Sequence, residues 1–316
     1  MSLPTPRRVV VAVVGPTATG KSRLAIRLAE RLGGEVINCD STAVYRRFDI
    51  GTDKVPPAER GGVPHHLIDV VEPVDTYSAA RYAREAAAAV DEIVGRGALP
   101  IVTGGTGLYY RALTRGIFPG PERDAALRAR LERVAARRGV ECLHRSLSRV
   151  DEESARRILP RDLKRIVRAL EVYYLTGRPL TAHFADTRSP LDGYEVVPLC
   201  LALPTAVLAE RVERRVREQF SRGLVDEVRQ ILADGVPETA HPFSGLVYRQ
   251  VLEMLHGVRD EAATRELIVA ENRRYARRQL IWFRKEPNLL WLHAPGEAPE
   301  TMEVAIAALR AQGVLA

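Results

Sequence analysis

The sequence predicts an α/β fold, in which helices flank a parallel sheet core and an all-helical segment interrupts the chain. The chain opens with an apolar strand pattern, a glycine-rich turn and a helical pattern, and strand and helix signals then alternate up to about residue 117. Strand signals are missing from residue 118 to residue 192, and another apolar strand pattern follows. Alternating strands and helices are typical of a parallel sheet with helices on both faces.

The first element is the apolar run at residues 9–14, which predicts a buried strand. The motif that follows consists of Gly15, Pro16, Thr17, Ala18, Thr19, Gly20, Lys21 and Ser22. It matches G-x-x-x-x-G-K-S/T, the P-loop, and a helical pattern begins at Ser22. Backbone N–H groups, a helix N-terminus and Lys21 suit a phosphate or diphosphate, and the Ser22 hydroxyl can ligate Mg²⁺. The fold class is therefore a P-loop NTPase-like core with an all-helical insertion domain.

The following elements are short. Residues 35–39, 67–71 and 99–103 predict strands, and Ser78 is the predicted cap of a helix that ends at residue 95. A loop rich in proline and glycine covers residues 51–66. Its last two residues are histidines, which have no third ligand at a suitable spacing and are expected in a loop rather than a metal site.

Two polar residues lie at the ends of predicted strands, where ligands bind in folds of this kind. They are Asp40 and Thr106. The Asp40 carboxylate could ligate Mg²⁺, orient a hydroxyl nucleophile, take a proton as a general base, or cap the next turn. The strand before Gly104 lacks the terminal acid that ATP-hydrolysing P-loop proteins usually carry. This absence favours a transferase whose P-loop holds a leaving group.

The remainder of the chain is mostly helical. Residues 194–203 and 289–292 predict strands, and residues 261–285 predict a long helix. The expected organisation is a first part of the core at residues 1–117, a helical insertion at residues 118–192 and a second part of the core at residues 193–316.

Composition gives weaker information. The chain has 316 residues and a net charge of +7, and residues 122–168 hold fourteen basic and eight acidic residues. This segment is either a contact surface for a polyanion or a set of solvated helix faces. No apolar run approaches the length of a membrane span, and three widely spaced cysteines suit a reducing cytoplasm.

Two further groups of arginines permit two interpretations each. Arg211 and Arg215 share a helix face and either bind a diphosphate or face solvent. Arg277 and Arg278 precede Trp282 and Phe283. Such a segment suits nucleic acid, but it also suits a helix whose aromatic residues pack in the core, which is the interpretation we favour for the two aromatic side chains.

Taken in order, these motifs resemble one family, the bacterial tRNA dimethylallyltransferases, also called tRNA isopentenyltransferases. The matching stretches are residues 15–22, 40–45, 49–52, 65–69, 104–109, 162–171, 211–215, 223–224, 275–280 and 282–284. The resemblance implies transfer of a dimethylallyl group from dimethylallyl diphosphate to N6 of adenosine 37 in tRNA. It implies that the P-loop holds a diphosphate with Mg²⁺, that Asp40 is the general base, and that Thr106 and Arg215 contact the diphosphate or the reacting centre.

The resemblance also implies that the insertion grips the anticodon stem-loop of tRNA. The expected tRNA-binding residues are Asp40, Ser41, Thr42, Ala43, Arg128, Lys164, Arg165, Arg168, Arg249, Arg277 and Arg278. The chain departs from the family pattern at three of its positions. Lys164 and Ala43 stand where glutamine is common, and Val247 replaces a glycine.

Three rival functions make different predictions. A prenyltransferase of free adenine nucleotides would accept AMP, ADP or ATP, a small-molecule kinase would turn over ATP, and a non-catalytic RNA-binding protein would show no activity to lose. The basic insertion favours tRNA as the acceptor. We expect a cytoplasmic monomer that does not bind a membrane.

Overall fold

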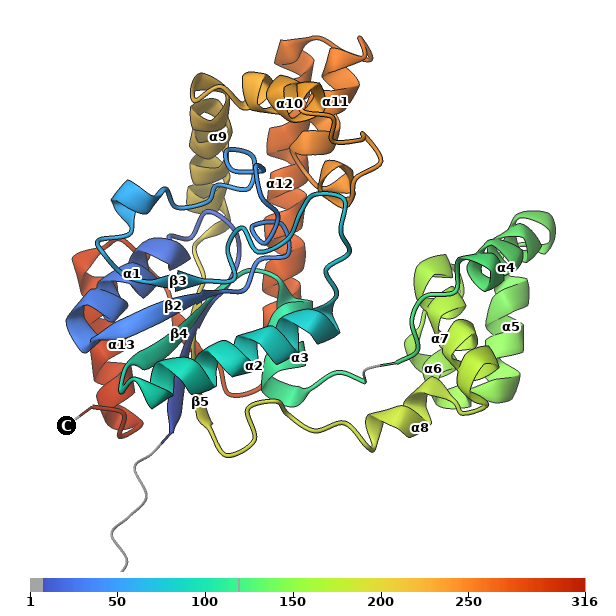
Figure 1. Ribbon diagram of the computed structural model, residues 1–316, viewed down its shortest axis with the longest axis horizontal. Coiled ribbons are helices and arrows are strands. Elements are labelled where there is room, and N and C mark those ends of the chain that lie inside the picture. The colour runs from blue at the N-terminus through green and yellow to red at the C-terminus, as the bar shows by residue number, and fades with distance from the viewer. Residues whose placement is uncertain (1–7, 119, 316) are drawn as a thin grey trace, which may run out of the picture. The chain divides into compact units, whose positions relative to one another are not determined.

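The computed structural model describes residues 8–118 and 120–315, and its centre is a parallel sheet of six strands (Figure 1). The strands are β1 (Val9–Val14), β2 (Gly34–Asn38), β3 (His65–His66), β4 (Leu99–Gly104), β5 (Glu195–Leu201) and β6 (Leu290–Leu292). Their order in the sheet is β3-β2-β4-β1-β5-β6, and every pairing is parallel. The α/β class with a parallel P-loop-like core is confirmed.

The central strand β1 explains why the sheet is covered on both faces. Val11 and Val13 belong to an apolar cluster with α1 (Lys21–Leu32) and α13 (Pro299–Ala311), whereas Val10 and Val14 belong to a second cluster with α2 (Ala79–Gly95). Successive side chains of a strand point to opposite faces, so a strand that is apolar at every position must be buried on both. The predicted cap of α2 is present, because the Ser78 side chain accepts a hydrogen bond from the Arg81 N–H group.

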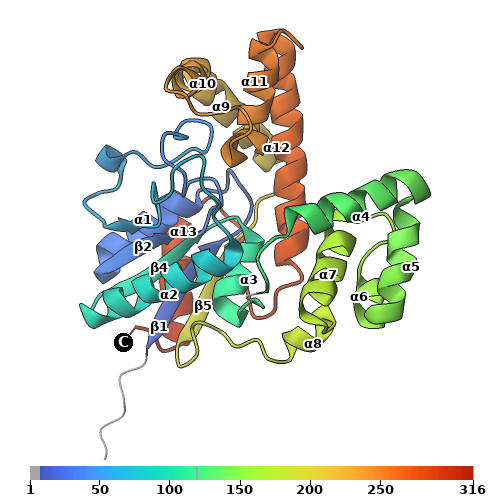
Figure 2. The same cartoon turned by 45° about the vertical axis from the view of Figure 1, so that its right-hand side comes forward.

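The second apolar cluster also includes helices that follow β5. The remaining core helices are α3 (Gly107–Arg115), α9 (Thr205–Ser221), α10 (Leu224–Ala233), α11 (Tyr248–Leu255) and α12 (Glu261–Phe283), with short 3-10 helices at Pro57–Glu59 and His241–Ser244. Figure 2 shows α12 as the longest rod of the core. Phe283, at its end, is fully buried, and Trp282 is partly buried against the cluster, as the core interpretation of these aromatic residues predicts.

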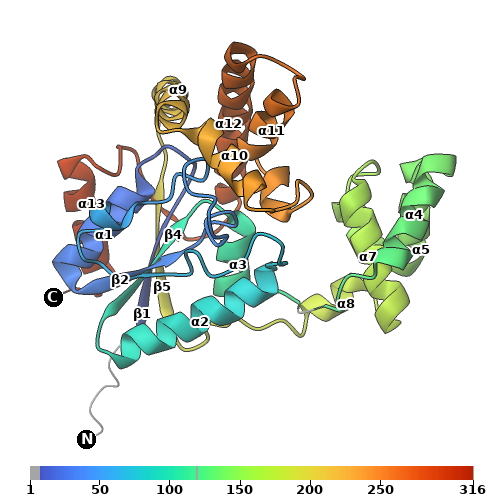
Figure 3. The ribbon, with the colours of Figure 1, turned by 45° about the horizontal axis from the view of Figure 1, so that its top comes forward.

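A separate helical unit comprises residues 115–189, and the α/β unit comprises residues 1–114 and 190–316. The helices of the helical unit are α4 (Ala125–Arg138), α5 (Val140–Val150), α6 (Glu152–Arg157), α7 (Leu163–Thr176) and α8 (Leu180–Phe184). Figure 3 labels α4, α5, α7 and α8, and Figure 1 labels α6 as well. The unit has its own apolar core, which includes Leu131, Leu147, Ile166 and Leu170. The expected insertion, residues 118–192, is displaced from this unit by three residues at each end.

One predicted strand was wrong. Residues 67–71 do not form a strand, and the edge strand β3 is made instead by the two histidines that were expected in a loop. The reason is local backbone geometry, because Leu67 and Asp69 have φ angles of 60° and 57°, which an extended strand cannot contain. His66 contacts the Glu35 carboxylate at 2.6 Å. Among residues 8–118 and 120–315, no helix has the length and apolar character needed to cross a bilayer.

Candidate active site

The P-loop connects the carboxyl end of β1 to the N-terminus of α1. Gly15 and Gly20 have φ angles of 133° and 87°, which disfavour other residues. A Cβ atom at Gly15 would clash with the Leu201 carbonyl oxygen, and one at Gly20 would clash with the Glu297 carboxylate. Both glycines are therefore required by the backbone path and by the close approach of neighbouring segments.

Lys21 lies inside this turn. Its Nζ donates to the Pro16 carbonyl oxygen at 2.6 Å, and Thr19 Oγ1 donates to the same oxygen at 2.8 Å. Desolvation lowers the pKa of Lys21 to about 8, with a further contribution from the nearby Arg215 cation. A bound anion would favour the protonated form, so the lysine and an anionic ligand are thermodynamically coupled.

The pKa of Lys21 leads to a test with inorganic pyrophosphate. Above pH 8 the free protein loses the Lys21 charge, so the affinity of the wild type should fall relative to that of Lys21→Arg, whose charge persists. Titration calorimetry of both proteins from pH 6.5 to 9.5 measures the ratio of their affinities. Ionisation of pyrophosphate affects both affinities equally and therefore cancels in this ratio. Parallel pH profiles for the two proteins would contradict the assignment.

Arg211 and Arg215, one turn apart in α9, both face the P-loop rather than solvent. Arg211 Nε donates to the Ala18 carbonyl oxygen at 2.6 Å, and Arg215 Nη1 donates to Thr17 Oγ1 at 2.6 Å. The two arginines, Lys21 and Ser22 line one pocket of about 240 Å³. Of the two interpretations open for these arginines, the geometry supports the diphosphate site.

The polar residues at the ends of β2 and β4 also meet. The Ser41 N–H group donates to Thr106 Oγ1 at 3.0 Å, which joins the two segments. Asp40 Oδ1 accepts hydrogen bonds from Thr42 N at 2.9 Å, from Thr42 Oγ1 at 2.6 Å and from Ala43 N at 3.4 Å. Within the described residues, the other carboxylate oxygen accepts no hydrogen bond. One oxygen thus caps the turn, and the second remains available to accept a proton.

Gln279, which the motif analysis did not assign to the site, links the two halves of it. Its Oε1 accepts from the Thr17 N–H group at 2.8 Å, and its Nε2 donates to the Gly105 carbonyl oxygen at 2.8 Å. Tyr275 lies one turn earlier in α12. Burial and the nearby Asp40 carboxylate raise the pKa of Tyr275, and the Thr106 and Gln279 side chains adjoin it. The sequence signals for this face of α12 were the spacing of four residues and the family resemblance of residues 275–280.

The arginines of the helical unit fall into two groups. Arg128 Nε and Arg168 Nη1 bind the Glu171 carboxylate at 2.7 Å and 2.6 Å, and the Glu171 side chain is fully buried. Lys164 and Arg165 are exposed at the start of α7. In the α/β unit, Arg277 and Arg278 are exposed on α12, and Arg249 is half-exposed on α11.

The sequence matches the IPP transferase family over residues 43–286. The chain belongs to this family. Proteins named tRNA dimethylallyltransferase from Solibacter usitatus and Acidothermus cellulolyticus are 48% and 51% identical to it, over 94% and 92% of this chain and 96% and 91% of their own lengths.

Solved structures agree with this family membership. The tRNA isopentenylpyrophosphate transferase of Bacillus halodurans is 35% identical, with a TM-score of 0.71 over 97% of this chain and 98% of that one. A eukaryotic dimethylallyltransferase, described as acting on tRNA, is 27% identical, with a TM-score of 0.79 over 96% of this chain and 79% of its own.

The structure places two of the residues expected to depart from the family pattern. Ala43 is buried, and its N–H group contacts Asp40 Oδ1 in the turn that Asp40 caps. Val247 has a φ angle of 77°, which a β-branched residue rarely adopts and a glycine adopts freely. The backbone geometry at Val247 therefore suits the glycine that the resemblance leads us to expect there.

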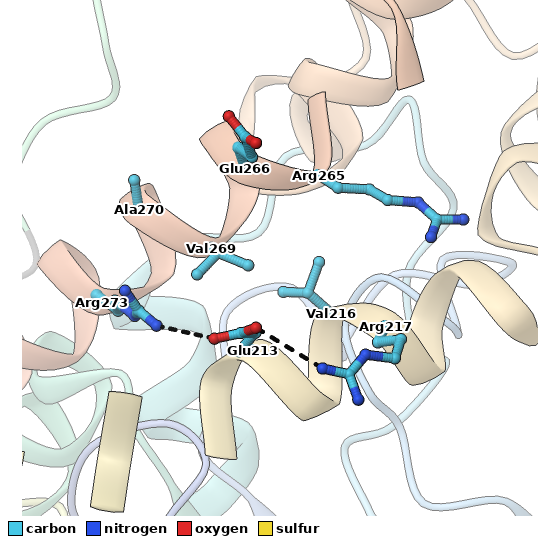
Figure 4. Close-up of a pocket in the computed structure, with 8 residues that line it drawn as sticks. All are labelled: Glu213, Val216, Arg217, Arg265, Glu266, Val269, Ala270 and Arg273. Carbon is cyan, nitrogen blue, oxygen red and sulfur yellow. Dashed lines mark hydrogen bonds and ion pairs between the residues drawn. The ribbon is translucent and has the colours of Figure 1, made fainter. Parts of the chain in front are cut away.

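A second cavity of about 410 Å³ lies between α9 and α12 (Figure 4). Val216 and Val269 are among the residues that line it. The Glu213 carboxylate lies 3.2 Å from Arg273 Nη2 and 3.7 Å from Arg217 Nη2 (Figure 4). Because neither the P-loop nor Asp40 lines this cavity, we assign it no part in the chemistry.

Proposed function

We propose that this protein transfers the dimethylallyl group of dimethylallyl diphosphate to N6 of adenosine 37 in tRNA. One observation carries the proposal. The Gln279 side chain ties an anion-binding P-loop with two arginines to the segment that holds Asp40 and Thr106. A site for a diphosphate leaving group thus adjoins a carboxylate that can accept a proton. The names of the relatives support the choice of donor and acceptor.

The P-loop side of the site acts on the leaving group. When the bond between the allylic carbon and the diphosphate oxygen breaks, negative charge grows on the diphosphate. Lys21, Arg211, Arg215 and the N-terminus of α1 are fixed around the pocket before the reaction, so they stabilise this charge without reorganising.

The Asp40 side acts on the acceptor. The lone pair of the adenine N6 amine forms the new bond to the allylic carbon, and the amine then loses one proton to the uncapped oxygen of Asp40. This amine is a weak nucleophile because its lone pair is delocalised into the purine. Alignment of the amine by Asp40, Ser41 and Thr106 therefore supplies much of the rate.

The site could hold Mg²⁺ between the diphosphate group of the allylic substrate and the Ser22 hydroxyl. The Ser22 side chain lines the pocket. Among residues 8–118 and 120–315 no group of three or more histidine, cysteine or acidic side chains could hold a metal. Ser22, together with diphosphate oxygens and water, would therefore hold Mg²⁺, as is usual for phosphate-bound magnesium. When bound, Mg²⁺ neutralises charge on the leaving diphosphate.

For tRNA binding, the proposal assigns exposed cations rather than the two arginines that bind the buried Glu171 carboxylate. Lys164 and Arg165 of the helical unit, and Arg249, Arg277 and Arg278 of the α/β unit, are accessible to phosphate groups. Arg128 and Arg168 bind the Glu171 carboxylate, and their side chains are only partly exposed. The proposal therefore gives them a smaller share of the tRNA contact. Flipping of adenosine 37 out of its loop costs a few kcal/mol, which these contacts offset. We further propose a cytoplasmic monomer, in keeping with three free cysteines.

Charge reversal at Arg165 tests the tRNA surface of the helical unit. Arg165→Glu should weaken binding of an unmodified anticodon stem-loop by about tenfold and reduce the slope of log affinity against log salt by about 1. Fluorescence anisotropy at several salt concentrations measures both quantities. Arg145→Glu, an equally exposed change in α5, is the matched control. Equal losses in both variants would show an effect of net charge rather than a contact at Arg165.

The reaction itself is tested with radiolabelled dimethylallyl diphosphate, Mg²⁺ and two tRNAs that differ only in adenosine or guanosine at position 37. We expect label only in the adenosine tRNA. Label in free AMP, ADP or ATP instead would favour the nucleotide prenyltransferase, and phosphate transfer from labelled ATP would favour a kinase. Absence of every transfer from folded protein would overturn the proposal.

A further inference from the structure

Asp53, which no motif singled out, lies at the edge of the P-loop pocket. It is one of the residues that line the pocket with Lys21 and Ser22. Its φ angle is 58°, in the left-handed region that asparagine and aspartate enter more readily than other non-glycine residues. The contacts of the neighbouring residues hold the loop in this conformation.

Those contacts come from the loop around Asp53. The Ile50 N–H group donates to the Glu227 carboxylate at 2.7 Å, and the Gly51 N–H group donates to the Tyr248 hydroxyl at 2.9 Å. On the other side, the buried Lys54 ammonium donates to the Tyr45 carbonyl oxygen at 2.6 Å. With both neighbouring segments fixed, Asp53 has little freedom to leave the pocket.

The Asp53 carboxylate forms an ion pair with Arg215, and it contacts a different nitrogen of that guanidinium from the one that binds the P-loop. Asp53 Oδ2 lies 3.2 Å from Arg215 Nε, and Asp53 Oδ1 lies 3.6 Å from Arg222 Nη1. Arg215 Nη1 binds Thr17 of the P-loop, so Arg215 stands between the P-loop and Asp53. A chain of phosphates that starts in the P-loop and continues beyond Arg215 therefore meets a carboxylate.

We propose that Asp53 makes the P-loop selective for a diphosphate over a triphosphate. This inference rests on the proposed function, in which the P-loop holds a diphosphate. Two phosphate groups are matched by Lys21, Arg211 and Arg215, whereas a third would be repelled by the Asp53 charge and would compete with it for Arg215. Glu59 and Glu218 line the same pocket, but they pair with Arg23 and Arg214 of its wall, so the proposed selectivity is assigned to Asp53.

Such selectivity has a chemical purpose. Nucleoside triphosphates are the commonest ligands of P-loops, and one that filled this pocket would block the allylic donor. A fixed negative charge repels the additional anionic group, which is the only difference between the two ligands in this part of the pocket.

The test compares inorganic pyrophosphate with inorganic tripolyphosphate by titration calorimetry of the full chain, without divalent metal. We expect the wild type to bind pyrophosphate more tightly. In Asp53→Asn, the ratio of tripolyphosphate to pyrophosphate affinity should rise about fivefold. Asparagine tolerates positive φ as aspartate does, so this variant keeps the loop, and Asp53→Gly is a second variant that removes the charge and also permits positive φ. Asp192→Asn, at an exposed position before β5, is the matched control.

The outcomes separate the two proposals. An unchanged ratio in both Asp53 variants, or an equal rise for both anions, would overturn the selectivity role while leaving the diphosphate site in place. Failure of pyrophosphate to bind the wild type at all would contradict the proposed function as well. If the ratio of tripolyphosphate to pyrophosphate affinity rose as much in Asp192→Asn as in Asp53→Asn, the change would be an effect of net charge. That result would also overturn the inference.

Discussion

Replacing Asp40 with asparagine is expected to lower kcat for dimethylallyl transfer by a factor of about 10²–10⁴. Asparagine can still accept the Thr42 and Ala43 hydrogen bonds through its Oδ1 atom, so the capped turn should survive. It cannot accept the proton from the adenine N6 amine. The loss should therefore appear in single-turnover rates, whereas the affinities for tRNA and pyrophosphate should change by less than about threefold.

The matched control for this change is Asp75→Asn, which removes one carboxylate at an exposed position. It should leave the transfer rate within about twofold of the wild type. Should the tRNA affinity of Asp40→Asn collapse while the single-turnover rate at saturation is preserved, Asp40 would be a binding residue and the proton would have another acceptor.

The second large effect concerns Glu171, whose buried carboxylate joins α4 to α7. It accepts hydrogen bonds from Arg128, Arg168 and the Asp124 N–H group. Glu171→Gln leaves two half-buried guanidinium groups without their counter-charge. Loss of one partner of a buried pair typically costs about 3–5 kcal/mol, and partial exposure of both arginines reduces our expectation to about 2–3 kcal/mol. Hydrogen exchange of α4 and α7 amides, measured with urea unfolding, reports this loss.

An exposed pair provides the control. Glu152→Gln removes one partner of an ion pair with Arg156 in α6, which should cost less than about 0.5 kcal/mol because water already screens that pair. Equal protection of the α4 and α7 amides in Glu171→Gln and the wild type would show that the cluster contributes nothing to the stability of the unit.

Acid should reproduce the effect of this substitution. Although burial disfavours the ionised carboxylate, its hydrogen bonds from Arg128 and Arg168 lower the pKa of Glu171 to about 2, from an ordinary value of 4.5. The unfolded chain therefore binds the proton more readily than the folded one. The stabilisation is complete above pH 4.5 and is lost as the pH falls towards 2.

Most of the fold could be predicted from the sequence because its signals are local. The six valine and alanine residues of β1, the glycines of the P-loop and the Ser78 cap each determine the conformation of their own neighbourhood. The prediction failed at residues 67–71, which are apolar enough for a strand. There the positive φ angles of Leu67 and Asp69 end the strand at His66, and no local pattern indicates the sign of φ at such residues.

The sequence by itself determined the parallel core, the phosphate-binding motif and the placement of Asp40 and Thr106 at strand ends. That these two strands are neighbours was decided by the order of the sheet. The sequence could not determine the partner of each charged residue. Arg215 and Arg168 both lie in basic helical segments, yet the first contacts Thr17 of the P-loop and the Asp53 carboxylate, and the second binds a buried glutamate. Gln279 reaches Thr17 across 262 positions of sequence. Such partners are brought together only by packing of the whole chain, because hydrogen bonds and ion pairs depend on distance in space and not on order along the sequence.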